Sequence, residues 1–159
     1  MTMTMTTLTT APLSLLLERL FAEAEAATSP VLDDVYEEEQ MRLLQSKTDY
    51  RDLYGRLKDL WLPVSKETGT LLYMLARSSN ARTIVEYGTS FGISAHHLAA
   101  ELRDNGGGRL ITCEFEPSKA ARARQHFNVG GVSDLIEIRE GDALETLRQD
   151  LPESIDLVL

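Results

Sequence analysis

The chain has 159 residues, 43% hydrophobic and 26% charged, a composition that fits one globular domain with its own core. Its net charge of −9 argues against a nucleic-acid partner, and its single cysteine, Cys113, excludes an intramolecular disulfide and a cysteine-based zinc site. The apolar runs are too short to span a bilayer and the N-terminus lacks a signal peptide's basic flank, so we expect a cytoplasmic protein with no membrane partner.

The first part of the chain is predicted to be helical after a short, disordered Met-Thr leader. Apolar residues recur at helical spacing, and Pro and Ser residues separate the periodic segments. Helices are expected over residues 13–24, over 31–47, over 50–61 before Pro63, and from the cap Ser65 to about residue 78. The apolar stripes of the helices before Pro63 are consistent with a homodimer.

From Thr83 onward, strand patterns alternate with helical patterns. Strands are expected at 83–87, 109–114, 135–139 and 155–159, with helices at 93–103, 117–128 and 143–149. Such alternation implies right-handed crossovers and parallel strands. We therefore predict an α/β fold: a Rossmann-like parallel sheet whose first four strands have the order 3-2-1-4, with helices on both faces and an N-terminal helical segment in front.

The sequence stops within Ile155–Leu159, which reads as a buried strand. Chain termini usually lie in polar surface segments, and an uncovered apolar strand is an aggregation hazard. We therefore expect this chain to be the front part of a longer protein.

The stretch from Glu86 to Ser94 turns a strand into a helix through Gly88 and Gly92. Glycine lets the backbone approach a ligand closely, and the helix N-terminus offers unpaired N–H groups. The spacing Gly-x-x-x-Gly differs from the Gly-x-Gly-x-x-Gly of dinucleotide sites. Glu86 would repel a pyrophosphate and attract a cationic ligand, so the stretch disfavours a nicotinamide cofactor.

Two further carboxylates follow strand ends. Glu114 closes the second strand, where it can accept both hydroxyls of a ribose, although a plain surface carboxylate is the alternative. Asp142 with Glu145 matches a helix capping box, and Asp142 with the Ala143 backbone N–H could also face an adenine edge. Both interpretations of Asp142 remain open and are compatible.

Together these residues resemble class I S-adenosylmethionine-dependent methyltransferases, and more closely O-methyltransferases of the catechol and caffeoyl-coenzyme A type. The resemblance covers residues 62–159 and is strongest over 64–72, 85–94, 139–144 and 155–159. It implies S-adenosylmethionine as cofactor and methyl transfer to an oxygen of a small-molecule acceptor. Residues 1–62 would be a leader and helical segment with lid or dimer contacts, and residues 63–159 the N-terminal part of the cofactor-binding domain.

The resemblance also implies the cofactor contacts. These are Val64 and Glu86 at the methionine end, Gly88 and Thr89 in the loop under the cofactor, Ser94 at the methionine carboxylate, Glu114 at the ribose, and Asp142 and Ala143 at the adenine. Family members that use Mg²⁺ take its ligands after the fourth and fifth strands. Neither region is present here, so no metal ligand, catalytic base or other catalytic residue is assigned.

Two other functions are retained: a non-catalytic module that binds S-adenosylmethionine or a nucleoside, and, less favoured, a nicotinamide-dependent oxidoreductase. The histidines suggest no metal site, because His96 and His97 would point about 100° apart on a helix. His126 is expected at the surface, and Cys113 in the core.

Overall fold

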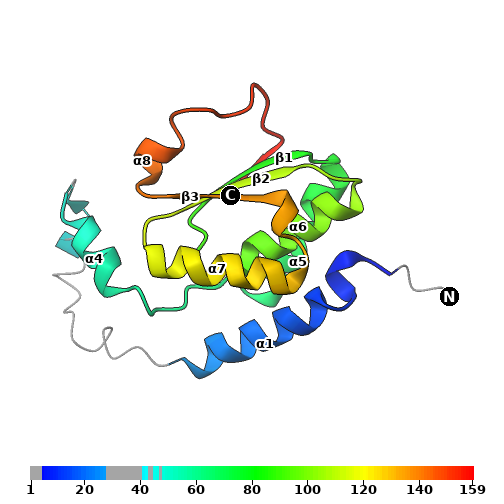
Figure 1. Cartoon of the computed structure of the whole chain (residues 1–159), viewed down its shortest axis with the longest axis horizontal. Coiled ribbons are helices and arrows are strands. Elements are labelled where there is room, and N and C mark those ends of the chain that lie inside the picture. The colour runs from blue at the N-terminus through cyan, green and yellow to red at the C-terminus, as the bar shows by residue number, and fades with distance from the viewer. Residues whose placement is uncertain (1–4, 28–40, 43–44, 47) are drawn as a thin grey trace.

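The computed structural model describes residues 5–27, 41–42, 45–46 and 48–159. Its centre is a four-stranded parallel sheet with the order β3-β2-β1-β4, which confirms the predicted order (Figure 1). The strands are β1 (Thr83–Tyr87), β2 (Arg109–Glu114), β3 (Ile136–Glu140) and β4 (Leu157–Val158).

The two central strands are buried on both faces and are mainly apolar, with Glu86 and Thr112 as buried polar exceptions. β1 pairs with β2 from Thr83 opposite Arg109 to Tyr87 opposite Cys113. β2 pairs with β3 so that Glu114 lies opposite Glu140. The carboxyl ends of these three strands therefore share one edge of the sheet, where polar residues follow each of them.

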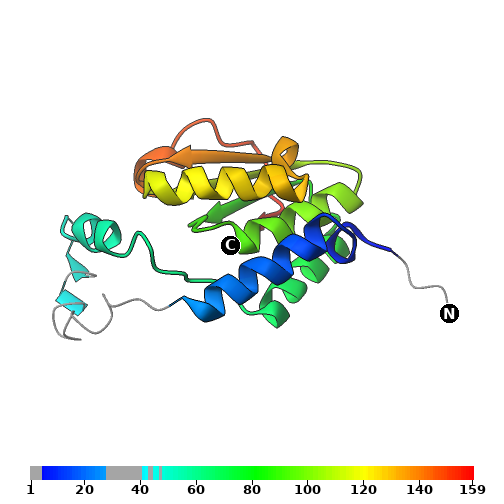
Figure 2. The ribbon, with the colours of Figure 1, turned by 60° about the horizontal axis from the view of Figure 1, so that its bottom comes forward.

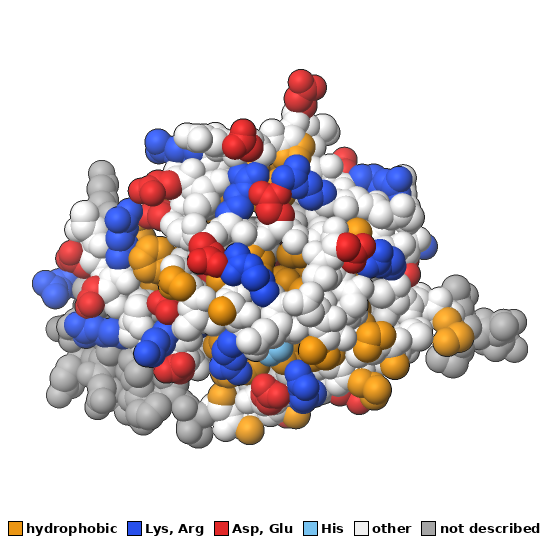
Figure 3. All heavy atoms as spheres, in the orientation of Figure 1, with side chains coloured by type: hydrophobic (Ala, Val, Ile, Leu, Met, Phe, Trp, Pro, Cys, Tyr) orange, Lys and Arg blue, Asp and Glu red, His pale blue; other side chains and the backbone are white. Residues whose placement is uncertain are grey.

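Helices lie on both faces of the sheet, as predicted. Three of them, α5 (Lys66–Ser79), α6 (Ile93–Asp104) and α7 (Pro117–Gly130), lie on one side. On the other side lie α8 (Ala143–Thr146) and the segment that leads to β4 (Figures 1 and 2). No helix in the described ranges is long and apolar enough to cross a membrane. Acidic and basic side chains are interspersed over the face seen in Figure 3.

The N-terminal helix α1 (Leu13–Ala26) belongs to the same core, packing against α6 and α7 (Figure 2). The apolar face expected for it is buried from Leu13 to Phe21, so this stripe is used within the chain. The leader is not disordered throughout: residues 7–9 form the short 3₁₀ helix η1, and the Thr7 hydroxyl donates to Asp104 Oδ1 over 2.6 Å.

The helix α4 (Tyr50–Arg56) is shorter than predicted. The expected helix continued to Trp61, but the chain leaves helical geometry after Arg56, and the Trp61 ring packs against Phe91 with ring centroids 4.2 Å apart. Tertiary packing of Trp61 thus overrides its helical periodicity. The helix expected over 31–47 lies largely outside the described residues.

Two other boundaries differ from expectation near the C-terminus. α8 ends at Thr146 rather than at Gln149. The reason is that the Arg139 guanidinium donates to the carbonyl of Thr146 over 2.8 Å and to that of Gln149 over 2.7 Å, so these carbonyls are satisfied without a longer helix. The strand expected over 155–159, and expected to be buried, is regular only at Leu157–Val158. Its outward side chain Val158 is 71% exposed.

Candidate functional site

The glycine turn after β1 depends on left-handed backbone geometry. Gly88 and Gly92 have φ of +93° and +90°, and Ser90 between them has +49°. Gly92 is also required for space, since a Cβ there would lie 2.6 Å from the Phe127 ring. The turn is held to β2 by the Thr89 N–H, which donates to the Cys113 carbonyl over 2.8 Å. The backbone therefore passes close to the end of β2 before α6 begins.

Glu86 is buried beneath this turn, with 1% of its surface exposed. Its two oxygens accept from the hydroxyls of Ser94, over 2.5 Å, and Thr112, over 2.7 Å. Burial raises the pKa of Glu86 to about 7, although both hydroxyl contacts oppose the rise and the nearby Glu114 adds to it. Near neutral pH this carboxyl is thus poised between its acid and its ionised form.

Glu114 connects the glycine turn after β1 to the loop after β2 by two hydrogen bonds. Its Oε2 accepts from the Ser90 N–H over 2.7 Å, and its Oε1 accepts from the Glu116 N–H over 2.9 Å. A carboxylate has about four acceptor positions, so each oxygen can accept one more hydrogen bond. Glu114 is therefore rigidly oriented and still able to receive two hydroxyl groups.

A cavity of about 230 Å³ opens beside Glu114, at the carboxyl ends of β1, β2 and β3. Four of the predicted site residues line it: Gly88, Glu114, Asp142 and Ala143. Sequence reasoning did not assign the rest of its wall, which is mainly aromatic and apolar. These residues are Tyr50, Tyr54, Leu57, Leu62, Tyr87, Ser90, Cys113, Phe115, Lys119 and Gly141. In the sequence, the one sign of this wall is that Tyr50 and Tyr54 share a face of the helix predicted over residues 50–61.

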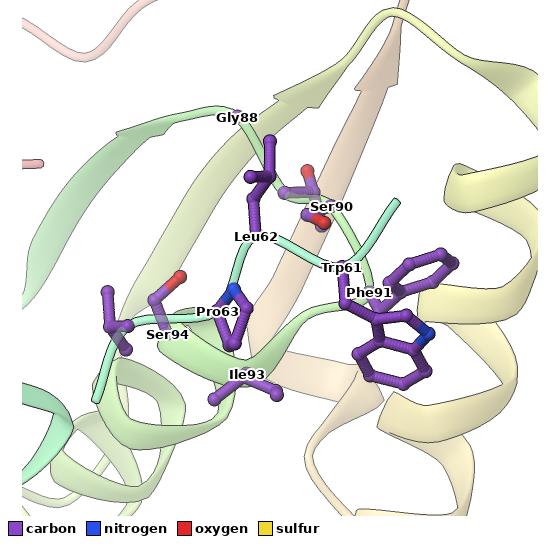
Figure 4. Close-up of a pocket in the computed structure, with 10 residues that line it drawn as sticks. Trp61, Leu62, Pro63, Gly88, Ser90, Phe91, Ile93 and Ser94 are labelled. Atoms are coloured by element: carbon purple, nitrogen blue, oxygen red, sulfur yellow. The ribbon is translucent and has the colours of Figure 1, made fainter. Parts of the chain in front are cut away.

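A second, smaller hollow of about 30 Å³ adjoins the cavity and shares Leu62, Gly88 and Ser90 with it. Figure 4 shows Leu62 beside the glycine turn and Trp61 alongside Phe91. The remaining predicted residues found here are Val64, Thr89 and Ser94. Glu86 lines neither space: it lies behind Ser94 and reaches the hollow only through that hydroxyl.

We call residues 49–64 the strap; it consists of α4 and the segment that leads to α5. The strap contacts the cavity wall at Asp142. Asp142 Oδ2 accepts a hydrogen bond from the Tyr50 hydroxyl over 2.5 Å and another from Arg51 over 3.0 Å. The other oxygen of Asp142 caps α8 by accepting from the Leu144 N–H. The Tyr50 contact is the main reason that the pKa of Asp142 lies below its ordinary value. Asp142 thus caps α8 as predicted, but Glu145 does not complete the expected capping box, because its carboxylate accepts from Arg51 instead.

The three histidines are structural in this region. His96 and His126 are both buried, and their Nδ1 atoms donate to the carbonyls of Gly92, over 2.5 Å, and Phe91, over 2.9 Å. The expectation that His126 is at the surface was wrong, because α7 turns it toward the glycine turn. Cys113 is in the core as expected, and burial raises the pKa of its thiol. Among the described residues, no three His, Cys, Asp or Glu side chains form a group that could hold a metal ion.

The chain is similar to known proteins in sequence and in fold. Residues 33–158 match the family described as O-methyltransferase. A catechol O-methyltransferase from Niastella koreensis is 38% identical over 88 residues, which are 55% of this chain and 39% of that relative. The chain thus spans less than half the length of the curated relatives it matches.

Two solved structures share the fold and carry a ligand named in their descriptions. The O-methyltransferase TomG from Streptomyces achromogenes, in complex with SAM, is 34% identical with a TM-score of 0.58, and the match covers 78% of this chain and 61% of that one. The O-methyltransferase from Bacillus cereus, in complex with SAH, is 28% identical with a TM-score of 0.59, covering 77% and 58%. On the match over residues 33–158, this chain belongs to the O-methyltransferase family.

Proposed function

We propose that the protein is an S-adenosylmethionine-dependent O-methyltransferase that acts on a small molecule. The observation that carries the proposal is Glu114, a fixed carboxylate with free acceptor positions beside a glycine turn, at the edge where parallel strands end. The SAM and SAH complexes of TomG and the Bacillus cereus enzyme support the same cofactor for this chain.

The larger cavity is the proposed place of the nucleoside part of this cofactor. Glu114 would accept the two ribose hydroxyls, while Asp142 and the Ala143 backbone would face the adenine. The apolar wall of Tyr54, Leu57 and Phe115 suits the faces of a purine ring. The aromatic and apolar surroundings would also exclude water from the nucleoside.

The smaller hollow is the proposed place of the methionine end, next to Val64, Gly88, Thr89 and Ser94. About 30 Å³ holds roughly one or two water molecules, which is too little for an amino-acid tail. The end of the strap at residues 61–64 covers this hollow, so we propose that it moves outward when the cofactor enters. Glu86 would act from behind Ser94, where its ionised form would be favoured by a cationic amino group.

When bound, S-adenosylmethionine supplies a methyl group on a positively charged sulfur, which an acceptor oxygen can attack in line. The residues of this chain contribute by binding and aligning the cofactor and by keeping water out. The negative charges of Glu86 and Glu114 would stabilise the positive charge on the sulfur of S-adenosylmethionine before the methyl group is transferred. A catalytic base and Mg²⁺ ligands are not among the residues that we assign.

A non-catalytic cofactor-binding module is the second candidate, since the residues that line the two spaces are accounted for by cofactor binding alone. Methyl transfer to a catechol panel, with and without magnesium, separates the two functions when it is measured on the full-length protein. Transfer from S-adenosylmethionine supports the enzyme, whereas S-adenosylhomocysteine binding without transfer supports the module.

The cofactor site is tested by calorimetric titration of S-adenosylhomocysteine into the wild type, Glu114→Ala and Glu140→Ala. Glu140 ends the neighbouring strand opposite Glu114 and pairs with Arg124, but it does not line the cavity. We expect Kd to rise at least tenfold for Glu114→Ala, because two hydrogen bonds to a charged group are lost, and to stay unchanged for Glu140→Ala. Equal affinity of Glu114→Ala and wild type would refute the ribose role.

We also propose that residues 63–159 are the N-terminal part of the cofactor-binding domain and that residues 1–62 provide the lid. The strap's contacts with Asp142 support the lid role. Homodimer formation and a cytoplasmic location are further proposals. A dimer is supported by Leu71, Met74 and Leu75, which form an exposed apolar stripe on α5.

A further inference from the structure

Lys119 is a buried cation in the wall of the larger cavity. It lies in the first turn of α7 and is 6% exposed, although lysine is rarely so buried. Its ammonium lies 5.4 Å from the centre of the Phe91 ring. It makes no hydrogen bond and no ion pair with any residue that the structure describes.

The Lys119 side chain is largely covered, but its ammonium nitrogen is not among the fully buried unpaired atoms of the described residues, so it keeps access to the cavity. Burial lowers the pKa of Lys119, while the carboxylates of Glu114, Glu116 and Asp59 act in the opposite direction. None of these three is close enough to form an ion pair. The ammonium therefore retains donors for a group that enters the cavity.

The chemistry of a ribose matches this arrangement. Each ribose hydroxyl has one hydrogen to donate and two lone pairs that accept. Glu114 can receive the hydrogens but cannot serve the lone pairs, because an ionised carboxylate only accepts. The Tyr50 hydroxyl, another donor in the cavity wall, is already used by Asp142. Lys119 is the cationic donor that lines the same cavity as Glu114.

We propose that Lys119 is a ligand-binding residue that donates a hydrogen bond to the ribose hydroxyl oxygens, while Glu114 accepts their hydrogens. The two side chains together select a nucleoside with free 2′ and 3′ hydroxyls. This inference rests on the proposed function, since it assigns a further contact within the same cofactor site.

Arg122 provides a matched control. It lies on the same helix, one turn after Lys119, and its guanidinium lies 4.5 Å from the centre of the same Phe91 ring. It also contacts the Trp61 ring, at 5.5 Å, but it does not line the cavity. Replacing either residue by methionine removes one positive charge and a cation–π contact with Phe91, and Arg122→Met also removes the contact with Trp61. Only Lys119→Met removes a donor from the cavity.

The experiment measures S-adenosylhomocysteine binding by calorimetry to this chain as wild type, Lys119→Met and Arg122→Met, after checking that their thermal midpoints agree. We expect Kd to rise roughly tenfold or more for Lys119→Met and to change less than about twofold for Arg122→Met. Competition with adenosine and 2′,3′-dideoxyadenosine gives the second readout. Lys119→Met should weaken adenosine binding and leave the dideoxy analogue unaffected.

Three results would be decisive against particular claims. If Lys119→Met and Arg122→Met bind S-adenosylhomocysteine equally, Lys119 has no role in binding and the inference is refuted. Equal weakening of adenosine and the dideoxy analogue would also refute it, because the contact would not be to the ribose hydroxyls. If the wild type itself fails to bind S-adenosylhomocysteine, the proposed function is what fails.

Discussion

Replacing Glu86 by glutamine should make the protein more stable at neutral and alkaline pH. Glutamine keeps the size of the side chain, and the hydroxyls of Ser94 and Thr112 can rotate to bond its amide. It removes the buried charge that the wild type must accept once Glu86 ionises. The substitution therefore tests whether burial controls this carboxyl.

The magnitude follows from the two protonation equilibria. The pKa of Glu86 is raised to about 7 in the folded protein, against an ordinary value of 4.5. Below pH 4.5 both states are protonated, and the contribution of Glu86 is fully present. As pH rises from 4.5 to 7 the unfolded chain ionises first, so wild-type stability falls. At 1.36 kcal/mol per pH unit, the wild type should lose about 3 kcal/mol relative to Glu86→Gln.

Urea unfolding of both proteins, followed by circular dichroism between pH 4.5 and 8, measures this difference. Glu101, whose pKa burial also raises to about 7, is present in both proteins and cancels in the comparison. Glu140→Gln makes the same substitution at an exposed strand end and serves as the control for a change that removes no buried carboxyl. A Glu86→Gln difference that does not change with pH would refute the reasoning.

Thr112→Val removes the donor to Glu86 Oε2 without changing the side chain's shape, and should lower the free energy of unfolding by about 1–3 kcal/mol at pH 8. Urea unfolding checks this, and a smaller loss at pH 5, where Glu86 is protonated, is expected as well. Tyr50→Phe removes the 2.5 Å contact with Asp142 and should speed amide hydrogen exchange in α4 but not in α8, whose Asp142 cap remains. Unchanged exchange in α4 would show that this contact does not hold the strap.

The sheet could be predicted from the sequence because its signals are local. The runs at Thr83–Tyr87 and Arg109–Glu114 each contain a β-branched and aliphatic core and have a glycine at one end, and their boundaries agree with the structure. The carboxylates that follow strand ends could be placed at one edge for the same reason, since parallel topology brings such ends together.

What could not be predicted depends on contacts between distant segments. Trp61 continues a helical pattern but leaves the helix to pack on Phe91, and Arg139 ends α8 early by binding its carbonyls. The burial of His126 depends on which face α7 turns to the glycine turn. Lys119 carries no motif, so its proposed role follows only from its place in the wall of the cavity. No periodicity or spacing encodes such pairings.

The strap's attachment to Asp142 has a consequence for ligand entry. In the proposed site this carboxylate serves the adenine, yet it already accepts from Tyr50 and Arg51 of the same chain. For a ligand that needs Asp142 Oδ2, the strap is thus an intramolecular competitor at high effective concentration, and the measured affinity equals the intrinsic affinity multiplied by the fraction of molecules in which this oxygen is free. Association would then be gated by release of α4 from Asp142 rather than by diffusion of the nucleoside.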